Sequence, residues 1–308
     1  MKSSMCRSQR RLAPSSCLSI LVGILVAFGS AKTARAQALG WEGETGVFVT
    51  PLAYTASVEE GPTLHPVVAY HYFNAGPIIG DFHEISIEVG VSKRFEFGYT
   101  HEFHVFGDNP SLSPLWQNGF EIFNGKFVLV PENYDKQKWV PAISVGFIAR
   151  TNVRNVGNWV SQNSTNPGMV GGKCNGDIYA VASKIVPTKP IPIVLSAGVR
   201  GTDAELWGMG GNAPDWQARA FGAVAFVFKG PKRSTIILGS EAAQQPHHPY
   251  GFPTLSIPTT LTYCARFIPS SKHHLNFDVG VAQVAGVVMP GVDLKARHQV
   301  GAQVSYGF

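Results

Sequence analysis

Charged side chains recur at alternate positions within several apolar stretches, and they are the residues best placed to do chemistry. The acids lie early in the chain and the bases lie later; the candidates are Glu84, Glu88, Glu96, Glu102, Arg150, Lys184, Arg200, Arg219 and Arg266. If they line a channel, acids on one arc and bases on another create a field that orients and filters charged or dipolar solutes. The same charges could instead pair across a narrow interior and fill it, because buried charges require partners. The sequence leaves both interpretations open.

Other chemistries find little support in the residue pattern. The adjacent pairs His247-His248 and His273-His274 would point to opposite faces of a strand, and no cysteine or carboxylate stands nearby at ligand spacing. There is no G-x-S-x-G elbow for a hydrolase. The glycine-rich run at 207–212 lacks the Lys-Ser/Thr of a phosphate loop. We therefore predict no metal site, no cofactor and no enzymatic activity.

The elements that must position the charges are β-strands. In residues 84–92 branched apolar side chains alternate with Glu84, Ser86 and Glu88, and in residues 94–104 aromatic side chains alternate with polar ones. Side chains alternate across a strand with period 2, so each segment has one apolar and one polar face. The charged candidates belong to the polar faces.

Segments of this kind recur from residue 64 to the end, and we count about 12 of them, with a range of about 10 to 14. Short turns near 93, 133, 188, 230 and 270 alternate with longer loops near 112, 163, 208, 249 and 290. This rhythm is typical of a transmembrane barrel with short periplasmic turns and longer outside loops. We predict an all-β, antiparallel up-and-down barrel over residues 63–308.

The N-terminus predicts export. Residues 1–36 combine basic residues, an apolar stretch at 18–29 that is too short to span a bilayer, and small residues before Gln37, as in a cleaved signal peptide. Residues 37–62 are predicted to be an N-terminal extension or a first strand, in the periplasm or at the barrel mouth. Since 1–36 carries six of the 25 Lys and Arg, 19 remain against 20 Asp and Glu. The near-neutral remainder argues against nucleic-acid binding.

Composition leaves one alternative of a different class. Charged residues are 15% of the chain and hydrophobic residues 44%. A secreted chain of this kind without helix-length apolar runs is either a lipid-facing barrel or a soluble β-sandwich, here one that binds carbohydrate. Cys174 and Cys264 are the only cysteines after residue 36, and whether they pair is left open.

Several stretches carry a family resemblance. The closing strand, with Tyr306 and Phe308, resembles the last strand of bacterial outer-membrane barrels, where such residues form the signal for the barrel-assembly machinery. Residues 177–184, 196–211 and 300–308 resemble an uncharacterised proteobacterial domain-of-unknown-function family of outer-membrane barrel proteins. Residues 141–146 and 182–184 are more faintly similar to barrels associated with exopolysaccharide export.

These resemblances imply a barrel in the outer membrane, with lipids as neighbours and no catalytic residue. They leave the activity open. The function we predict is a narrow passive channel or transporter for a small solute, or a structural barrel. A component linked to exopolysaccharide export is the alternative.

Overall fold

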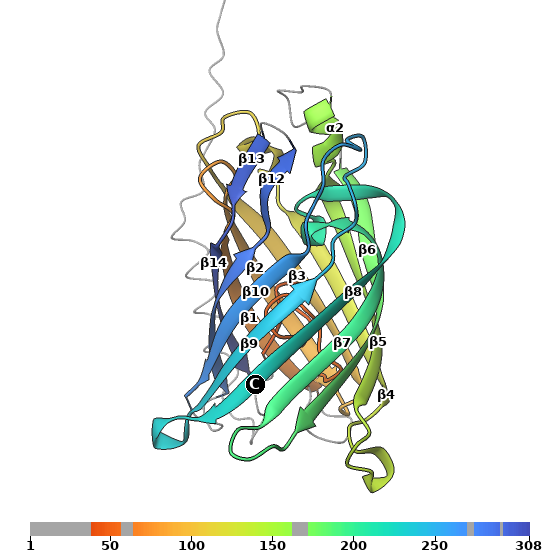
Figure 1. Cartoon of the computed structure of the whole chain (residues 1–308), viewed down its shortest axis with the longest axis vertical. Coiled ribbons are helices and arrows are strands. Elements are labelled where there is room, and N and C mark those ends of the chain that lie inside the picture. The colour runs from red at the N-terminus through yellow and green to blue at the C-terminus, as the bar shows by residue number, and fades with distance from the viewer. Residues whose placement is uncertain (1–37, 57–63, 162–171, 270–273, 290–291) are drawn as a thin grey trace, which may run out of the picture.

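The computed structural model describes residues 38–56, 64–161, 172–269, 274–289 and 292–308. Within them, twelve strands pair antiparallel in chain order, and the last pairs with the first to close one barrel (Figure 1). The predicted 12-strand barrel is confirmed. The β-sandwich is wrong, because each of these twelve strands has two neighbours in a single closed sheet. The barrel strands are β1 (Leu64–Asn74), β2 (Gly80–Val91), β3 (Phe95–Phe106), β4 (Phe120–Val130), β5 (Ala142–Arg154), β6 (Gly172–Val186), β7 (Ile193–Glu205), β8 (Gly211–Lys229), β9 (Thr235–Ala243), β10 (Thr260–Ile268), β11 (Leu275–Gln283) and β14 (Gln299–Gly307).

The connections differ between the two ends of the barrel. Tight turns lie at the lower end in Figure 1, and longer connections lie at the upper end, called here the loop end. The loop end carries α2 (Val156–Ser161) and a hairpin of β12 (Ala285–Met289) and β13 (Val292–Ala296). In the part of the chain that the structure describes, no helix is long and apolar enough to cross a membrane. The short 3-10 turns are η1 (Ser113–Trp116), η2 (Tyr134–Lys136), η4 (Leu206–Gly208) and η5 (Pro231–Arg233).

The faces of the strands are inverted relative to a soluble protein. Buried positions on the inward faces are often polar or charged, whereas large apolar side chains are exposed on the outward faces. The exposed ones include Ile87, Phe95, Phe97, Phe123, Phe127, Phe147, Ile178, Leu195, Val199, Phe226, Leu238, Tyr263, Phe267, Phe277, Val279 and Val300. An apolar exterior around a polar interior is the arrangement of a barrel solvated by lipid.

The C-terminus completes the barrel wall. The backbone N–H of Phe308 donates to the carbonyl oxygen of Pro66 at 2.9 Å, so pairing with the first strand continues to the last residue. The rings of Tyr306 and Phe308 meet edge to face with centroids 4.9 Å apart. Cys174 and Cys264 are free thiols and form no disulfide.

Candidate functional site

The inward faces carry most of the charges identified in the sequence. Arg219 lies opposite Arg200 in the strand register and shares its inward face, although it is partly exposed. Arg266 also points inward, and its Nε donates to Asp278 Oδ1 at 2.7 Å. The remaining inward residues are almost completely buried: Glu84, Glu88, Glu96, Glu102, Arg150 and Arg200.

Lys184 differs from this set. It lies opposite Leu195, which is 46% exposed on the outward face. Residues directly opposite each other in a ladder share a face, so Lys184 belongs to the outside of the barrel. Its Nζ lies 3.2 Å from Glu132 Oε1, at the end with tight turns. The prediction that Lys184 lines the lumen is therefore corrected.

Residues 38–56 occupy the lumen. This segment forms no barrel strand. Its β-type pairing, among the described residues, is limited to two isolated bridges, Leu39 with Thr45 and Gly46 with Pro51. Figure 1 shows it as the orange coil inside the barrel. Its partners come from opposite walls, on β3, β4, β5, β6, β9, β10 and β14. The predicted extension or first strand, in the periplasm or at the mouth, is thus found inside the barrel; residues 57–62 lie outside the described residues.

Glu241 on β9 binds three consecutive backbone amides of this segment. The N–H groups of Phe48, Val49 and Thr50 donate to its carboxylate at 2.7, 3.0 and 2.7 Å, and Thr50 Oγ1 donates at 2.7 Å. Successive amides that converge on one anion form a concave nest. Hydrogen bonds to an ionised acceptor are stronger than neutral ones. Glu241 therefore anchors the centre of the segment.

A second anchor lies across the lumen, on β3 and β4. Lys126 Nζ contacts Glu96 Oε1 at 2.6 Å and donates to the carbonyl oxygens of Thr45 and Leu52, both at 2.9 Å. Glu96 in turn accepts from the backbone N–H groups of Thr45 and Ala56 at 2.9 and 2.8 Å. The remaining hydrogen-bonding groups of Lys126 and Glu96 thus bind the backbone of the segment. Such additional hydrogen bonds are needed to offset the cost of burying a charged pair.

Arg150 joins the segment to the later strands. Its Nε donates to Glu42 Oε1 at 2.5 Å, and its Nη2 donates to Asp177 Oδ2 at 2.9 Å. Arg200 Nη1 lies 3.6 Å from the same Asp177 oxygen. Two arginines and two carboxylates therefore compensate one another in a fully enclosed cluster.

The other acids of β2 and β3 have no such compensation. Both carboxyl oxygens of Glu84, Glu88 and Glu102 are buried without a hydrogen-bond partner in the described chain, as are those of Glu44 in the segment. Burial, reinforced by the neighbouring Glu42 carboxylate, raises the pKa of Glu44 well above its usual range. Burying a charged carboxylate without a partner costs free energy, so the protonated form of Glu44 is favoured.

Glycines in both the wall and the segment allow the two to approach closely. Phe48 packs against Gly301 on β14, where an added Cβ would lie 2.6 Å from its Cζ atom. Gly43, in the segment itself, has a φ of +92°, and a Cβ there would overlap Thr100 Oγ1 on β3. Any side chain at these two glycines would force the segment and the wall apart.

Several functional residues were missed in the sequence, namely Lys126, Asp177, Glu241 and Asp278. Each stands on the polar face of its own strand, so the alternation that identified Glu96 and Arg150 could have found them. Glu241, for example, alternates with Leu238 and Ala242, which are exposed on the outward face. In the described ranges no three His, Cys, Asp or Glu side chains are arranged to hold a metal ion.

Comparisons with known proteins find similarity of structure only. No family model matches the sequence, and no curated protein matches it. Among solved structures, the chain is similar to the KdgM porin, with 12% identity, a TM-score of 0.42, and coverage of 79% of this chain and 98% of that one. For the NanC porin, the identity is 6% and the TM-score 0.44, with coverage of 80% of this chain and 99% of that one. For an outer membrane channel from Pseudomonas putida F1, the identity is 8% and the TM-score 0.43, with coverage of 81% of this chain and 97% of that one. Similarity at this level assigns the chain neither a solute nor an activity.

Proposed function

We propose that this chain is an outer-membrane β-barrel that acts as a passive channel for small polar solutes, and that residues 38–56 close its lumen at rest. The observation that carries the proposal is the charged interior, where Glu241 and Lys126 bind the backbone of this segment and Arg150 binds the side chain of Glu42. Departure of the segment would expose Glu96, Lys126, Arg150 and Glu241 to the lumen. A pore lined in this way selects solutes by charge and size.

A structural barrel is the second candidate, and one observation favours it. The segment contacts opposite walls through buried ion pairs and hydrogen bonds, as a permanent core would. Small barrels commonly fill their interiors with side chains. The two candidates differ in one respect, which is whether the segment moves.

A reversible cross-link separates them. The backbone N–H of Ala53 donates to Ser183 Oγ at 2.9 Å, so the two residues adjoin. We would introduce Ala53→Cys and Ser183→Cys in a background of Cys174→Ser and Cys264→Ser, and measure conductance in planar bilayers. The channel predicts little conductance when oxidised and more after reduction; the matched control is the background without the new cysteines.

A variant lacking residues 38–56 completes this test. The channel predicts stable open-state conductance from it, provided that it retains the heat-modifiable gel mobility of a folded barrel. Absence of conductance from both the reduced cross-link variant and the folded deletion variant would support the structural barrel. Equal conductance of the oxidised and reduced forms would show that the segment does not close the lumen.

The location and partners form part of the same proposal. We infer that residues 1–36 direct export, that outer-membrane lipids surround the apolar exterior, and that Tyr306 and Phe308 present the assembly signal. The resemblance to the uncharacterised family and to exopolysaccharide-export barrels remains a prediction. Fractionation of cells, with and without Phe308→Ala, tests the location and the signal together: loss of the folded barrel in the variant is expected.

A further inference from the structure

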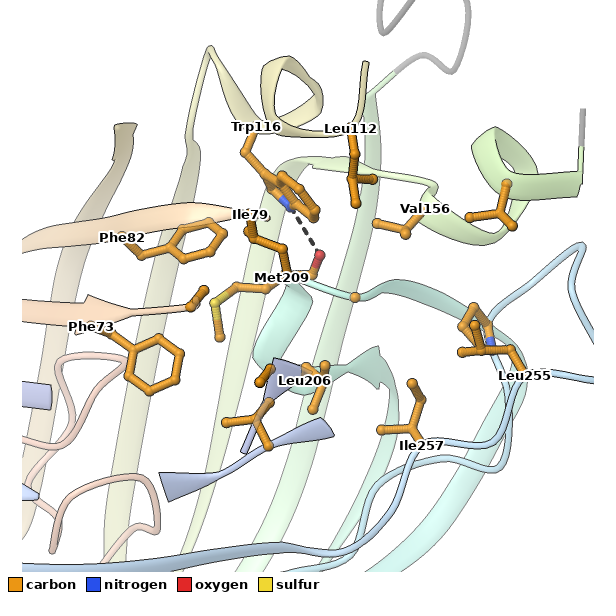
Figure 2. A pocket seen from close by; sticks show the side chains of 16 residues that line it. Phe73, Ile79, Phe82, Leu112, Trp116, Val156, Leu206, Met209, Leu255 and Ile257 are labelled. Carbon is orange, nitrogen blue, oxygen red and sulfur yellow. Dashed lines mark hydrogen bonds between the residues drawn. The ribbon is translucent and has the colours of Figure 1, made fainter. Parts of the chain in front are cut away.

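An apolar cavity lies at the loop end of the barrel, above the N-terminal segment. Its volume is about 100 Å³. Its walls are formed by 16 residues, and none of them has a charged side chain. The indole N–H of Trp116 is the one side-chain donor in the wall, and it donates to the carbonyl oxygen of Met209 at 2.9 Å (Figure 2). The cavity therefore offers its contents no unsatisfied side-chain hydrogen-bonding group.

Every connection at the loop end contributes to this cavity. One representative from each of the six, in chain order, is Ile79, Leu112, Val156, Met209, Leu255 and Val284. Figure 2 shows the labelled side chains converging on a common space from these loops and, for Phe73 and Phe82, from β1 and β2. Loops that face water are ordinarily polar at their tips. Because six loops direct apolar side chains to one point, these side chains form the walls of a single cavity.

Aromatic rings form the side of the cavity nearest the barrel. Phe82 packs edge to face on Trp116 with ring centroids 5.7 Å apart. Phe73 packs on Trp41 of the N-terminal segment at 5.6 Å. Phe73 and Met209 also line a second void of about 10 Å³, against Trp41 and Phe48. A molecule in the cavity would thus rest directly above the segment that occupies the lumen.

We propose that this cavity is a binding site for a small apolar molecule, an aromatic or short aliphatic hydrocarbon. Apolar cavities stay free of water, because water needs polar partners, and one of about 150 Å³ can hold benzene. The volume, the apolar walls and the rings of Phe73, Phe82 and Trp116 all suit such a ligand. The site is independent of whether the lumen conducts polar solutes, since its residues are not those that anchor the segment.

Fluorobenzene binding, followed by ¹⁹F NMR, tests this site. The full chain is embedded in lipid nanodiscs, and empty nanodiscs of the same lipid report the signal of probe dissolved in the bilayer. Val284→Phe fills the cavity, whereas Val281→Phe makes the same change on the outward face, where Val281 is 36% exposed. We expect a saturable shift for wild type and for Val281→Phe, and a loss of affinity of about tenfold or more for Val284→Phe.

Two results would overturn the proposal. One is a wild-type signal indistinguishable from that of empty nanodiscs. The other is equal affinity of the Val284→Phe and Val281→Phe proteins. If Val284→Phe fails to fold, as judged by gel mobility without heating, the smaller filling change Ala75→Leu takes its place and the same two outcomes decide.

Discussion

The middle of the lumen and the loop-end cavity are enclosed by the same barrel but hold their contents differently. In the middle, residues 38–56 are fixed by hydrogen bonds and ion pairs to Glu96, Arg150 and Glu241. At the loop end, apolar side chains surround a void and the indole of Trp116 makes the one side-chain hydrogen bond of the wall. Directional polar contacts specify one occupant, whereas apolar contacts are non-directional and accept any molecule of suitable size.

This contrast predicts that polar substitutions in the middle have large effects and that substitutions at the loop end have small ones. Arg150→Ala should have the largest effect, because it leaves Glu42 and Asp177 buried without their main counter-charge. We expect a loss of about 3–5 kcal/mol of unfolding free energy, measured by guanidinium titration in lipid vesicles. Arg297→Ala removes an exposed pair with Asp293 and should change stability by less than about 1 kcal/mol. Equal losses would contradict the contrast.

Glu241→Ala comes next, because it leaves three backbone N–H groups of the segment without their acceptor. A loss of about 1–3 kcal/mol is expected, concentrated in local opening of residues 48–50. Hydrogen exchange of these amides measures it. The control is Glu121→Ala on the outward face, which should leave exchange at residues 48–50 as in wild type. Unchanged protection in Glu241→Ala would show that the carboxylate is not an anchor.

Gly301→Val tests the fit between the segment and the wall. The new Cβ would lie 2.6 Å from the Phe48 ring, so the ring must move. Overpacking of this kind costs about 1–3 kcal/mol. Ala302→Val also places a valine side chain on the same strand, but on its outward face, where we expect a change within about 0.5 kcal/mol. The measurement is the thermal unfolding midpoint of each variant. Equal midpoints would show that the wall accommodates a side chain at position 301.

At the loop end, Trp116→Phe removes the hydrogen bond to the Met209 carbonyl oxygen. The expected loss is about 1 kcal/mol, because one neutral hydrogen bond is lost while most of the apolar contact remains. Trp216→Phe makes the same change at a side chain that is 54% exposed and should be close to neutral. A larger loss than that of Glu241→Ala would reverse the ranking of the two regions.

The last prediction concerns the pH dependence of stability. The pKa of Glu44 is raised in the folded state by burial, so the folded chain holds this proton at pH values where the unfolded chain has released it. This group therefore makes the folded state progressively less stable as pH rises above about 4.5, the usual pKa of a glutamate. Glu44→Gln should match wild type near pH 4 and be more stable near pH 8. Parallel stability profiles for the two proteins would show that Glu44 is ionised in the fold.

Much of the barrel follows from local pattern. Alternation in residues 84–104 predicted which side chains of β2 and β3 face inward, because the pleat of a strand enforces a period of 2. Lys184 was predicted to face inward because it is charged, although the alternation along β6 puts its even-numbered position on the outward face. Ile178, six positions earlier on the same face of this strand, is 65% exposed, so the alternation alone would have placed Lys184 outside the barrel.

By itself, the sequence determined the strands, their faces and the two kinds of connection, since each is decided by neighbours along the chain. Only the tertiary structure decided that residues 38–56 lie in the lumen, because Phe48 and Glu241 are separated by 193 positions and meet only after closure. The loop-end cavity is likewise a product of closure, which brings six separate connections around one space. Contacts between distant residues depend on the shape of the whole barrel, and no local period of the chain encodes that shape.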